Sequence, residues 1–399
     1  MEEWKEYRLG EIAEMKYGKL PNKFAGCKGQ IPIWSGYRVV GHTNSVNCKK
    51  GTAIVVARGV GGTGDVKIAK EDCFLTNLSI SISLNEKICK PLYFYYKYQT
   101  KNLKYLDSGS AQSQITIEDL KRLQLNLPPI SYQNRVIEFL SPFYDKIEVN
   151  RKINSNLEEQ AKALFKSWFI DFEPFRDGKF VESELGKIPE GWKIGRYDNI
   201  VVGTIAGDWG KENSVGNYLH EVTCIRGCDF QDIKNGLIGN APTRFILEKN
   251  FKNKRFASHD ILVEISGGTQ TVSTGRVCPI SQKLLDRYNS NVVCTNFCRV
   301  VRPTEGYSAF AYYSWLYKYD HKVMFGYENG TSGIKNFRLN DFLSMEPLII
   351  PPENIVIEFQ NFIDSINSQI QTRGAESSKL ANIRDTLLPK LMSGEIDVR

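Results

Sequence analysis

The 399-residue chain lacks any apolar segment close to the length of about 18 residues that a membrane-spanning helix needs. Its first ten residues, MEEWKEYRLG, contain no positively charged stretch followed by an apolar core, so a secretory signal is not expected. The nine cysteines are odd in number and scattered, which is typical of free thiols rather than a disulfide-stabilised fold. These absences favour a cytoplasmic protein that has no contact with a membrane.

Motifs for nucleotide or methyl-group chemistry are also lacking. The segment GVGGTG (59–64) matches G-x-G-x-x-G, but the residues after it, DVKIAKEDCF, do not open a helix. We therefore expect a glycine-rich hairpin or loop there. Residues 126–129 (NLPP) differ from the Asn/Asp-Pro-Pro-aromatic loop of amino-methyltransferases by one extra residue and are followed by Ile130. No catalytic residue is assigned.

Metal-dependent chemistry finds little support. Asp260 and Glu264 have a spacing found in nucleases, but Ser266 stands where the lysine of such a site is expected. Two cysteine pairs have a spacing that structural zinc sites allow: Cys224 with Cys228, and Cys294 with Cys298. We interpret these thiols as small core residues on one face of a strand. The four histidines form no ligand pattern: His42, His220, His259 and His321. We therefore predict that this chain holds no metal.

The net charge of +7 is unevenly distributed. Residues 1–130 carry a net charge of +7 and residues 174–352 carry +3, whereas residues 131–173 and 353–399 carry −1 and −2. A polyanionic partner such as DNA is therefore expected to meet the first and third segments.

The chain repeats itself with a period of about half its length. Val136-Ile137-Glu138-Phe139 recurs as Val356-Ile357-Glu358-Phe359, in each case after a double proline. The same order of features precedes both copies: a Trp-Lys opening, a glycine with small polar neighbours, an acidic turn (TIEDL, RLNDF) and an apolar run (LQLNL, PLII). This fixed order predicts two tandem units, each a mixed domain followed by a helix.

Two segments carry apolar residues with alternating spacings of three and four, the repeat of a coiled coil. The first seam comprises Val136, Leu140, Phe143, Ile147, Asn150, Asn154, Leu157, Ala161, Leu164 and Trp168. The second comprises Val356, Phe359, Ile363, Ile366, Ile370, Arg373, Ser377, Leu380, Arg384, Leu387 and Leu391. We expect the two helices to pack on each other as an antiparallel pair with a polar middle. The alternative is two unrelated amphipathic helices, each packed on its own domain.

Pro142 lies within the first seam, where it predicts either a kink or the start of a new helix. Residues 142–170 would span roughly 40 Å as a helix, slightly more than one turn of DNA. A rod of this length suits two basic domains that read two short sites on one duplex.

The two mixed domains are expected to be rich in strands. Segments of β-branched or alternating character are TAIVVAR (52–58), NLSISISL (77–84), ILVEIS (261–266) and NVVCTNFCRVV (291–301). Each domain also contains one aromatic helical segment, residues 91–103 and 309–323, whose apolar face we assign to the core rather than to stacking on bases.

Glycine-rich loops between these strands supply side chains suited to DNA. Arginine pairs with guanine and glutamine with adenine, while Ser, Thr and Lys more often hold phosphates. The candidates are Arg58, Thr63, Gln112, Ser113, Gln114, Gln270, Thr271, Arg276, Thr331, Ser332 and Lys335. For any one of them, a plain solvated turn is the alternative. Among them, Arg276→Ala is expected to weaken DNA binding while assembly with protein partners persists.

Three segments resemble a known family. Residues 150–175 (NRKINSNLEEQAKALFKSWFIDFEPF) and 185–193 (LGKIPEGWK) are very similar to the central region of the specificity subunits of type I restriction–modification systems. Residues 379–398 (KLANIRDTLLPKLMSGEIDV) resemble the second helical region of that family. The tandem arrangement extends the resemblance over nearly the whole chain. Pro142 is a departure from it.

The resemblance implies a fold and a set of partners. It implies an α+β chain with two target recognition domains at opposite ends of an antiparallel helical pair, related by a pseudo-twofold axis. The domains would be residues 1–129 and 191–351, the helical spacers 130–173 and 352–399, and the linker 174–190. It further implies two modification subunits that use S-adenosylmethionine, and restriction subunits that use ATP and Mg²⁺, in a bacterial or archaeal cytoplasm.

We therefore interpret the chain as a non-catalytic subunit that recognises a bipartite, asymmetric sequence in double-stranded DNA. Two alternatives remain open. One is a coiled-coil scaffold that binds only proteins, and the other is a methyltransferase or nuclease whose active site is unrecognised.

Overall fold

The computed structural model describes residues 3–20, 29–36, 38–59, 62–107, 113–289, 291–330, 334–396 and 398. Its contacts divide the chain into two units. Unit 1 is Met1–Lys146 with Leu380–Arg399, and unit 2 is Ile147–Lys379. The division falls inside the two long helices rather than at their ends, so each helix contributes to both units. No helix within the described ranges is both long and apolar enough to cross a membrane.

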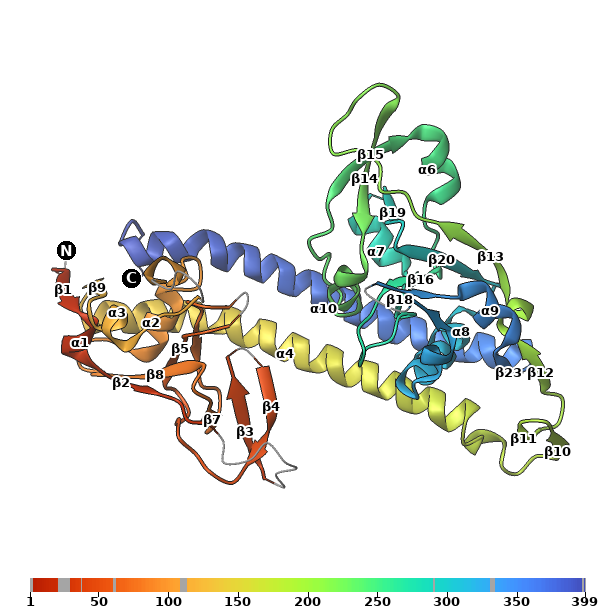
Figure 1. Ribbon diagram of the computed structural model, residues 1–399, viewed down its shortest axis with the longest axis horizontal. Coiled ribbons are helices and arrows are strands. Elements are labelled where there is room, and N and C mark those ends of the chain that lie inside the picture. Colours follow the sequence, from red (N-terminus) through yellow and green to blue (C-terminus); the bar gives the residue numbers. More distant parts are fainter. Residues whose placement is uncertain are drawn as a thin grey trace. The chain divides into compact units, whose positions relative to one another are not determined.

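Unit 1 contains a four-stranded antiparallel sheet and a three-stranded mixed sheet (Figure 1). The four-stranded sheet has the order β2 (Ala13–Tyr17), β8 (Ser79–Leu84), β5 (Ala53–Val56), β6 (Val66–Ile68). In the three-stranded sheet, β3 (Ile31–Ser35) pairs antiparallel with β4 (Arg38–Thr43) and parallel with β7 (Phe74–Leu75). A separate pair joins β1 (Lys5–Arg8) to β9 (Gln124–Leu127).

The short helices of unit 1 begin where the sequence supplies a start. In α3 (Ile117–Lys121), the Thr116 hydroxyl accepts from the Asp119 backbone and the Asp119 carboxylate accepts from the Thr116 backbone, so each satisfies a free N–H group. Pro91 opens α2 (Pro91–Lys97), and α1 spans Leu9–Ile12. Tyr93, Phe94 and Tyr96 of α2 are buried, which confirms the assignment of this aromatic segment to the core.

Unit 2 repeats this topology strand for strand. Its four-stranded sheet has the order β13 (Val201–Ala206), β20 (Cys298–Pro303), β16 (Ile261–Glu264), β18 (Val277–Pro279). In its mixed sheet, β14 (Tyr218–Ile225) pairs antiparallel with β15 (Thr243–Leu247) and parallel with β19 (Val292–Cys294). The partner of β12 (Lys193–Arg196) is β23 (Pro347–Ile350). The predicted tandem repeat is thus confirmed at the level of strand order and direction.

Unit 2 also has elements of its own. A three-stranded sheet has the order β17 (Ser266–Gly267), β22 (Lys335–Phe337), β21 (Glu328–Asn329), and a hairpin joins β10 (Phe180–Ser183) to β11 (Gly186–Pro189). Its shorter helices are α5 (Phe230–Lys234), α6 (Glu248–Lys254), α7 (Gln282–Arg287), α8 (Ser308–Asp320) and α9 (Leu339–Met345). The second aromatic segment forms α8, and its residues Phe310 and Trp315 lie in the hydrophobic core of unit 2.

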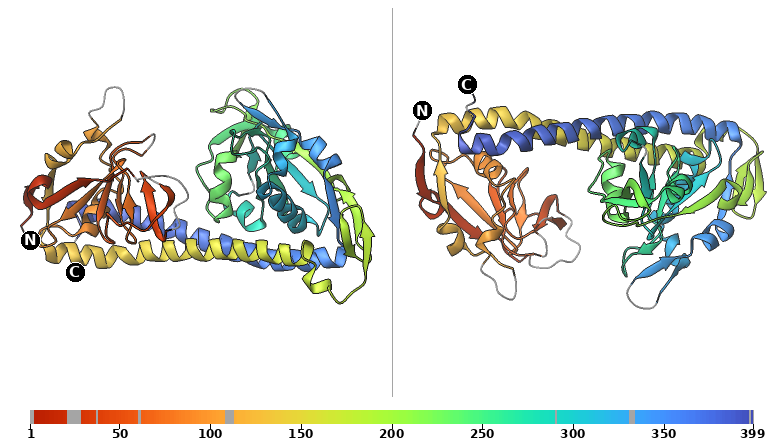
Figure 2. Two further views of the ribbon diagram at one scale, coloured as in Figure 1. Left: turned by 60° about the horizontal axis from the view of Figure 1, so that its bottom comes forward. Right: turned by 90° about the horizontal axis from the view of Figure 1, so that it is seen from above.

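Two long helices, α4 (Ile130–Phe169) and α10 (Glu353–Ser393), pack antiparallel in each unit (Figure 2). In unit 1 the Tyr132 hydroxyl donates to the Leu391 carbonyl (3.0 Å). In unit 2 the Asn150 amide donates to the Ser377 hydroxyl (3.2 Å). Residues early in α4 therefore meet residues late in α10. The α+β fold class with two strand-rich domains and an antiparallel helical pair is confirmed.

The predicted seam residues lie at this helix interface. Leu140, Asn150, Asn154, Phe359, Ile363 and Ile370 are buried; Phe143, Ile147, Leu157, Leu164, Trp168, Ile366, Leu380 and Leu387 are partly buried. Beyond Ala161 the seam shifts by one residue, because Phe165 and Phe169 are more buried than Leu164 and Trp168. Both phenylalanines also contact Phe310 of α8, so this end of α4 packs against the domain as well as against α10.

Pro142 lies inside α4, and the helix is not divided there. The prediction of a second helix starting at this residue is therefore wrong. Proline removes one backbone donor from the helix. Directly before it, Leu140 is buried and the Ser141 hydroxyl lies 3.0 Å from the Tyr96 hydroxyl of α2, so this part of the helix is packed on the domain.

The strand-rich part of unit 2 is fixed to the helical pair by contacts to main-chain carbonyls. The Asn154 amide donates to Asn235 O (3.0 Å) and to Ile370 O (3.2 Å). The Gln371 amide donates to Ile233 O (3.2 Å). Gly374 of α10 lies so close to Gly236 that a Cβ on it would approach the Gly236 carbonyl oxygen to 2.1 Å. Glycine is thus required at this point of the interface.

Candidate nucleic-acid interface

In unit 1 the glycine-rich segment connects two antiparallel strands, as predicted for a hairpin loop. The loop closes with a hydrogen bond from Gly64 N to Val56 O (2.9 Å). Gly64 has a φ of +93°, and a Cβ there would lie 2.3 Å from Lys104 N, so only glycine fits. A strand rather than a helix follows the loop, which excludes the dinucleotide-binding arrangement.

Three segments of unit 1 meet at Ala57 and Arg58. Arg58 forms a β-bridge with Gln114, which joins the hairpin loop to the segment before α3. The backbone N–H groups of Ala57 and Arg58 both donate to Leu78 O, at 2.8 and 3.2 Å. Two of the predicted contact residues, Arg58 and Gln114, are therefore brought together. The segment that contains Leu78, which was not among the predicted contacts, lies beside them.

The side chains at this junction differ in their availability. Ser113 and Gln114 are held by Asp107, whose carboxylate accepts from the Ser113 hydroxyl (2.5 Å) and from Gln114 N (2.8 Å). The Nε atom of Arg58 is buried and has no hydrogen-bond partner within the described part of the chain. The residue as a whole is partly exposed, so the other guanidinium nitrogens are the donors through which we expect it to reach an anion or a base edge.

Thr63 is buried, and its hydroxyl donates to Gly59 O (3.0 Å). Its role is to hold the hairpin loop, and the prediction that it reaches DNA is corrected accordingly. Three other predicted contacts, Gln112, Thr331 and Ser332, lie outside the described residues.

Unit 2 places the equivalent segments in the same way. Ser266 of β17 lies opposite Asn336 of β22, and the Ser266 hydroxyl donates to the Asn336 amide oxygen (2.6 Å). The backbone N–H groups of Ile265 and Ser266 donate to Phe297 O, at 2.8 and 3.3 Å. The junction at residues 265–266 thus corresponds to the junction at residues 57–58 of unit 1.

Gln270 and Thr271 lie exposed at the tip of the hairpin loop between β16 and β18. Thr269 shapes this tip, because its hydroxyl accepts from the backbone of Thr271 (3.2 Å) and of Val272 (3.0 Å). The side chains of Gln270 and Thr271 are accordingly presented to solvent, as a contact with DNA requires.

Arg276 and Lys335 are instead paired with buried carboxylates. The Arg276 guanidinium donates to both oxygens of Glu264, at 2.7 and 2.6 Å, and this pairing raises the pKa of Arg276. Lys335 Nζ donates to Glu328 (2.8 Å), which also accepts from Thr274. The Arg276 edge formed by Nε and Nη2 is therefore occupied. Both side chains therefore stabilise the loop, and the contact of each with DNA stays a prediction.

Asp260 and Glu264, the two carboxylates with the spacing found in nucleases, are each paired with an arginine. Asp260 accepts two hydrogen bonds from Arg302, at 2.7 and 2.8 Å, as Glu264 does from Arg276. Carboxylates held by arginines in this way are not arranged to bind a catalytic cation.

Cys224, Cys294 and Cys298 are buried, as expected of core residues, whereas Cys228 is exposed. The two members of a pair do not lie on one strand, which corrects that part of the interpretation. Cys224 lies in β14 and Cys228 in the 3₁₀ turn Gly227–Asp229, whereas Cys294 lies in β19 and Cys298 in β20. Burial raises the pKa of Cys224 and of Cys298 to about 12, so both thiols are neutral at pH 7. No group of three His, Cys, Asp or Glu residues in the described ranges is placed to hold a metal ion.

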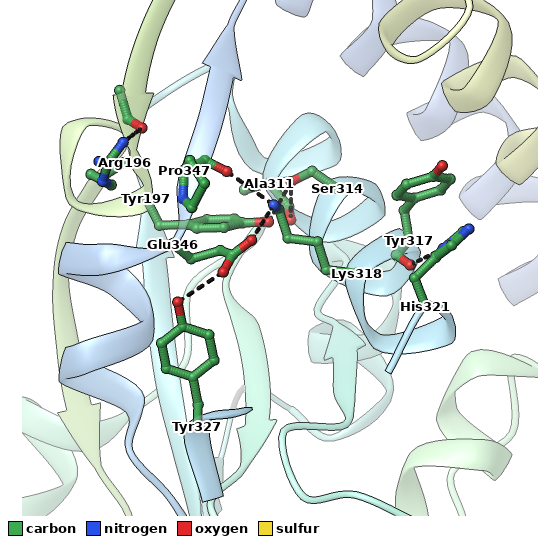
Figure 3. Close-up of polar contacts among 11 residues, drawn as sticks. Arg196, Tyr197, Ala311, Ser314, Tyr317, Lys318, His321, Tyr327, Glu346 and Pro347 are labelled. Atoms are coloured by element: carbon green, nitrogen blue, oxygen red, sulfur yellow. Dashed lines mark hydrogen bonds and ion pairs between the residues drawn. The ribbon is translucent and has the colours of Figure 1, made fainter. Parts of the chain in front are cut away.

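Lys318, Glu346 and Tyr327 form a partly buried cluster of polar side chains in unit 2 (Figure 3). Lys318 Nζ donates to Glu346 (2.5 Å) and to Pro347 O (2.9 Å), and the Tyr327 hydroxyl donates to the other Glu346 oxygen (2.8 Å). Burial and the Glu346 carboxylate raise the pKa of Tyr327 to about 12. Since every member is bonded to another, the cluster joins α8, the segment before β21 and the start of β23.

The family model described as "Type I restriction modification DNA specificity domain" matches residues 1–159 of this chain. This range includes the strand-rich part of unit 1 and most of α4.

Two curated relatives extend the similarity over most of the chain. The MjaIX specificity subunit of a type I restriction enzyme from Methanocaldococcus jannaschii is 27% identical over 366 residues, which cover 88% of this chain and 78% of the relative. The HindI specificity subunit of Haemophilus influenzae is 27% identical over 334 residues, 71% of each chain.

Among solved structures, the S subunit of a type I restriction–modification system from M. genitalium is similar over 98% of this chain and 96% of that one. The TM-score is 0.56 at 17% sequence identity. At this identity the likeness shows a shared fold, which includes both copies of the repeat.

Proposed function

We propose that this chain, which belongs to the family of type I restriction–modification specificity subunits, is the DNA-recognition subunit of such a complex. Each strand-rich domain reads one half of a bipartite site in double-stranded DNA. Members of this family are generally not catalytic, and the reactions are assigned to other subunits.

One observation carries this proposal. The same junction of three loop segments occurs twice in the chain, with different side chains at equivalent positions. Arg58 and Gln114 in unit 1 correspond to Ser266 and Asn336 in unit 2. Two junctions of one architecture but different chemistry are suited to two different half-sites, and hence to an asymmetric sequence.

The proposed contacts follow from which side chains the structure leaves available. Arg58 and Gln114, which are partly exposed, act in the first domain, and Gln270 and Thr271, which are exposed, act in the second. Ser113 is adjacent to Gln114, but its hydroxyl is bonded to Asp107. The excess of positive charge in residues 1–130 and 174–352 supplies the attraction to phosphates.

The helical pair has two proposed roles. Because α4 and α10 pass through both units, they set the spacing between half-sites, and their exposed faces bind two modification subunits. Those subunits transfer methyl groups from S-adenosylmethionine to adenine. Restriction subunits that use ATP and Mg²⁺ join the same complex.

The decisive experiment is sequencing of methylated adenines in DNA from cells that express this chain with its modification subunit. The expected result is methylation at one asymmetric bipartite sequence with a fixed spacer. Cells that express the modification subunit alone are the control. Methylation at the same sites without this chain would overturn the proposal.

A salt series of duplex binding gives a second, independent measurement. The affinity of the complex should fall steeply with salt concentration, because phosphate contacts release counterions. A protein that binds only other proteins would show no such dependence.

A further inference from the structure

A four-residue turn recurs at the junction in both units. In unit 1 it is Thr76-Asn77-Leu78-Ser79, and in unit 2 it is Thr295-Asn296-Phe297-Cys298. Each turn closes with a hydrogen bond from the fourth residue to the carbonyl of the first, at 3.1 Å in unit 1 and 3.0 Å in unit 2. The Thr-Asn pair is thus retained in two domains whose other loops differ.

Each turn is anchored at its threonine by the same contacts. Thr76 N donates to Trp34 O (2.9 Å), and Thr295 N donates to Ile225 O (3.0 Å). Both threonines are buried. A glycine covers each one: a Cβ on Gly18 would lie 2.1 Å from Thr76 O, and a Cβ on Gly207 would lie 1.9 Å from Thr295 O. The base of the turn is therefore rigid in both units.

The second and third residues form the tip, which lies beside the proposed DNA contacts. Leu78 O is bonded to the backbone of Ala57 and Arg58, as described above, and Phe297 O is bonded to that of Ile265 and Ser266. The tip of the turn in unit 1 therefore lies beside the backbone of Arg58, and its residues Asn77 and Leu78 are partly exposed.

The tip in unit 2 projects a large apolar side chain into solvent. Phe297 is 58% exposed, and Asn296 is exposed as well. Neither residue has a positive φ, so the backbone does not require asparagine at this place. The anchoring contacts explain the threonine and the glycine, but they leave the identities of the two tip residues unexplained.

Chemistry suggests what these two side chains recognise. The asparagine amide presents one donor and one acceptor, which match N7 and N6 of adenine, while phenylalanine and leucine make apolar contact with the methyl group of thymine. A rigid turn that carries this pair next to an arginine has the composition of a base-reading element.

We propose that Asn77-Leu78 and Asn296-Phe297 are base-reading tips, one for each half-site. This inference rests on the proposed function and adds residues to it. The shared asparagine contacts adenine in each half-site, and the third residue of the turn, Leu in one domain and Phe in the other, contacts a neighbouring base pair.

The test uses the full chain co-expressed with its modification subunit, and each domain serves as the control for the other. In Asn296→Ala and Phe297→Ala, the methylated sequence should lose discrimination at one or two adjacent positions of one half-site. The other half-site and the spacer should stay unchanged. Asn77→Ala should affect the opposite half-site. Affinity of the purified complex for the original duplex should fall roughly 10- to 100-fold in each asparagine variant.

Two further variants separate recognition from folding. Phe297→Leu introduces the residue that the same turn carries in unit 1, so it should fold normally and, because leucine can also contact the thymine methyl group, keep the sequence preference that Phe297→Ala loses. Met345→Ala removes another side chain that is 61% exposed, on α9, and should change neither sequence nor affinity.

Three outcomes would overturn the inference. The first is an unchanged methylated sequence and affinity in the alanine variants. The second is loss of the modification subunit from Phe297→Ala on gel filtration, which would make the tip a protein contact. The third is an equal loss of affinity for all duplexes with no change in sequence preference. A wild-type chain that directs no bipartite methylation would instead refute the proposed function itself.

Discussion

Replacement of Gly374 by alanine tests how closely α10 packs against Gly236 in the strand-rich part of unit 2. Helix propensity alone predicts a gain, since alanine in a helix interior is about 1 kcal/mol more favourable than glycine. The structure predicts the opposite sign. A Cβ at this position would lie 2.1 Å from Gly236 O and 2.2 Å from Gly236 C, and both are backbone atoms that cannot rotate away.

The size of the loss follows from what must move. The segment after α5 has to retreat by more than 1 Å from α10 before the Cβ reaches an ordinary contact distance. That retreat breaks the hydrogen bonds from Asn154 to Asn235 O and from Gln371 to Ile233 O. At about 1 kcal/mol for each bond, the two losses exceed the gain in propensity. We expect a net destabilisation of about 1 kcal/mol.

The assay is urea denaturation of the full chain followed by circular dichroism and by tryptophan fluorescence. Ser365→Ala, at an exposed position of the same helix, is the matched control and should gain up to about 0.5 kcal/mol. A Gly374→Ala chain as stable as wild type, or more stable, would refute the close approach.

Arg276→Ala should lower the free energy of unfolding by about 1–2 kcal/mol, because it leaves the carboxylate of Glu264, whose side chain is only 9% exposed, without its cation. Water screens the 40% exposed arginine, which keeps the loss at this size. Unchanged thermal unfolding together with weaker DNA binding would show that Arg276 serves DNA contact and not the stability of the loop. Asp364 raises the pKa of His259 in the folded chain through a hydrogen bond. The pair therefore contributes its full stabilisation to the folded state below about pH 6.5, the pKa of histidine in the unfolded chain, and this contribution is lost as the pH rises through the higher pKa of the folded state. The difference in free energy of unfolding between wild type and Asp364→Asn should therefore shrink between pH 6 and pH 8, and a difference that grows would contradict this sign. Lys318→Met leaves a buried carboxylate unpaired and should cost about 3 kcal/mol in urea denaturation; a loss below 1 kcal/mol would show that the cluster is not needed for stability.

Much of the architecture could be predicted from sequence because local patterns determine it. The segment TAIVVAR contains β5, NLSISISL contains β8, and the repeated order of short motifs anticipated the repeated strand order. The helical seams were predictable for the same reason, since three- and four-residue spacings place side chains on one face of a helix. Where a third element joins the interface, as α8 does at Phe165 and Phe169, the pattern of two helices alone no longer suffices.

The candidate site was less predictable, because the availability of a side chain depends on strand register. Arg276 and Glu264 are 12 residues apart in the sequence and become partners only when β16 and β18 form a hairpin. Thr63 was in a suitable loop but turned inward to Gly59. Conversely, the repeated Thr-Asn pair was visible in the sequence and could have indicated the third segment of each junction.

The attachment of the second strand-rich domain to the helices has an evolutionary consequence. Asn154 of α4 and Gln371 of α10 hold it through peptide oxygens, and such oxygens are present whatever residues the segment 233–236 carries, apart from the glycine that the close packing requires. Mutations can therefore accumulate on the outer loops without any matching change in the contacts to α4 and α10. A preference for a new DNA sequence can arise in this way. The contacts that attach this domain to the helices do not depend on which residues its outer loops contain.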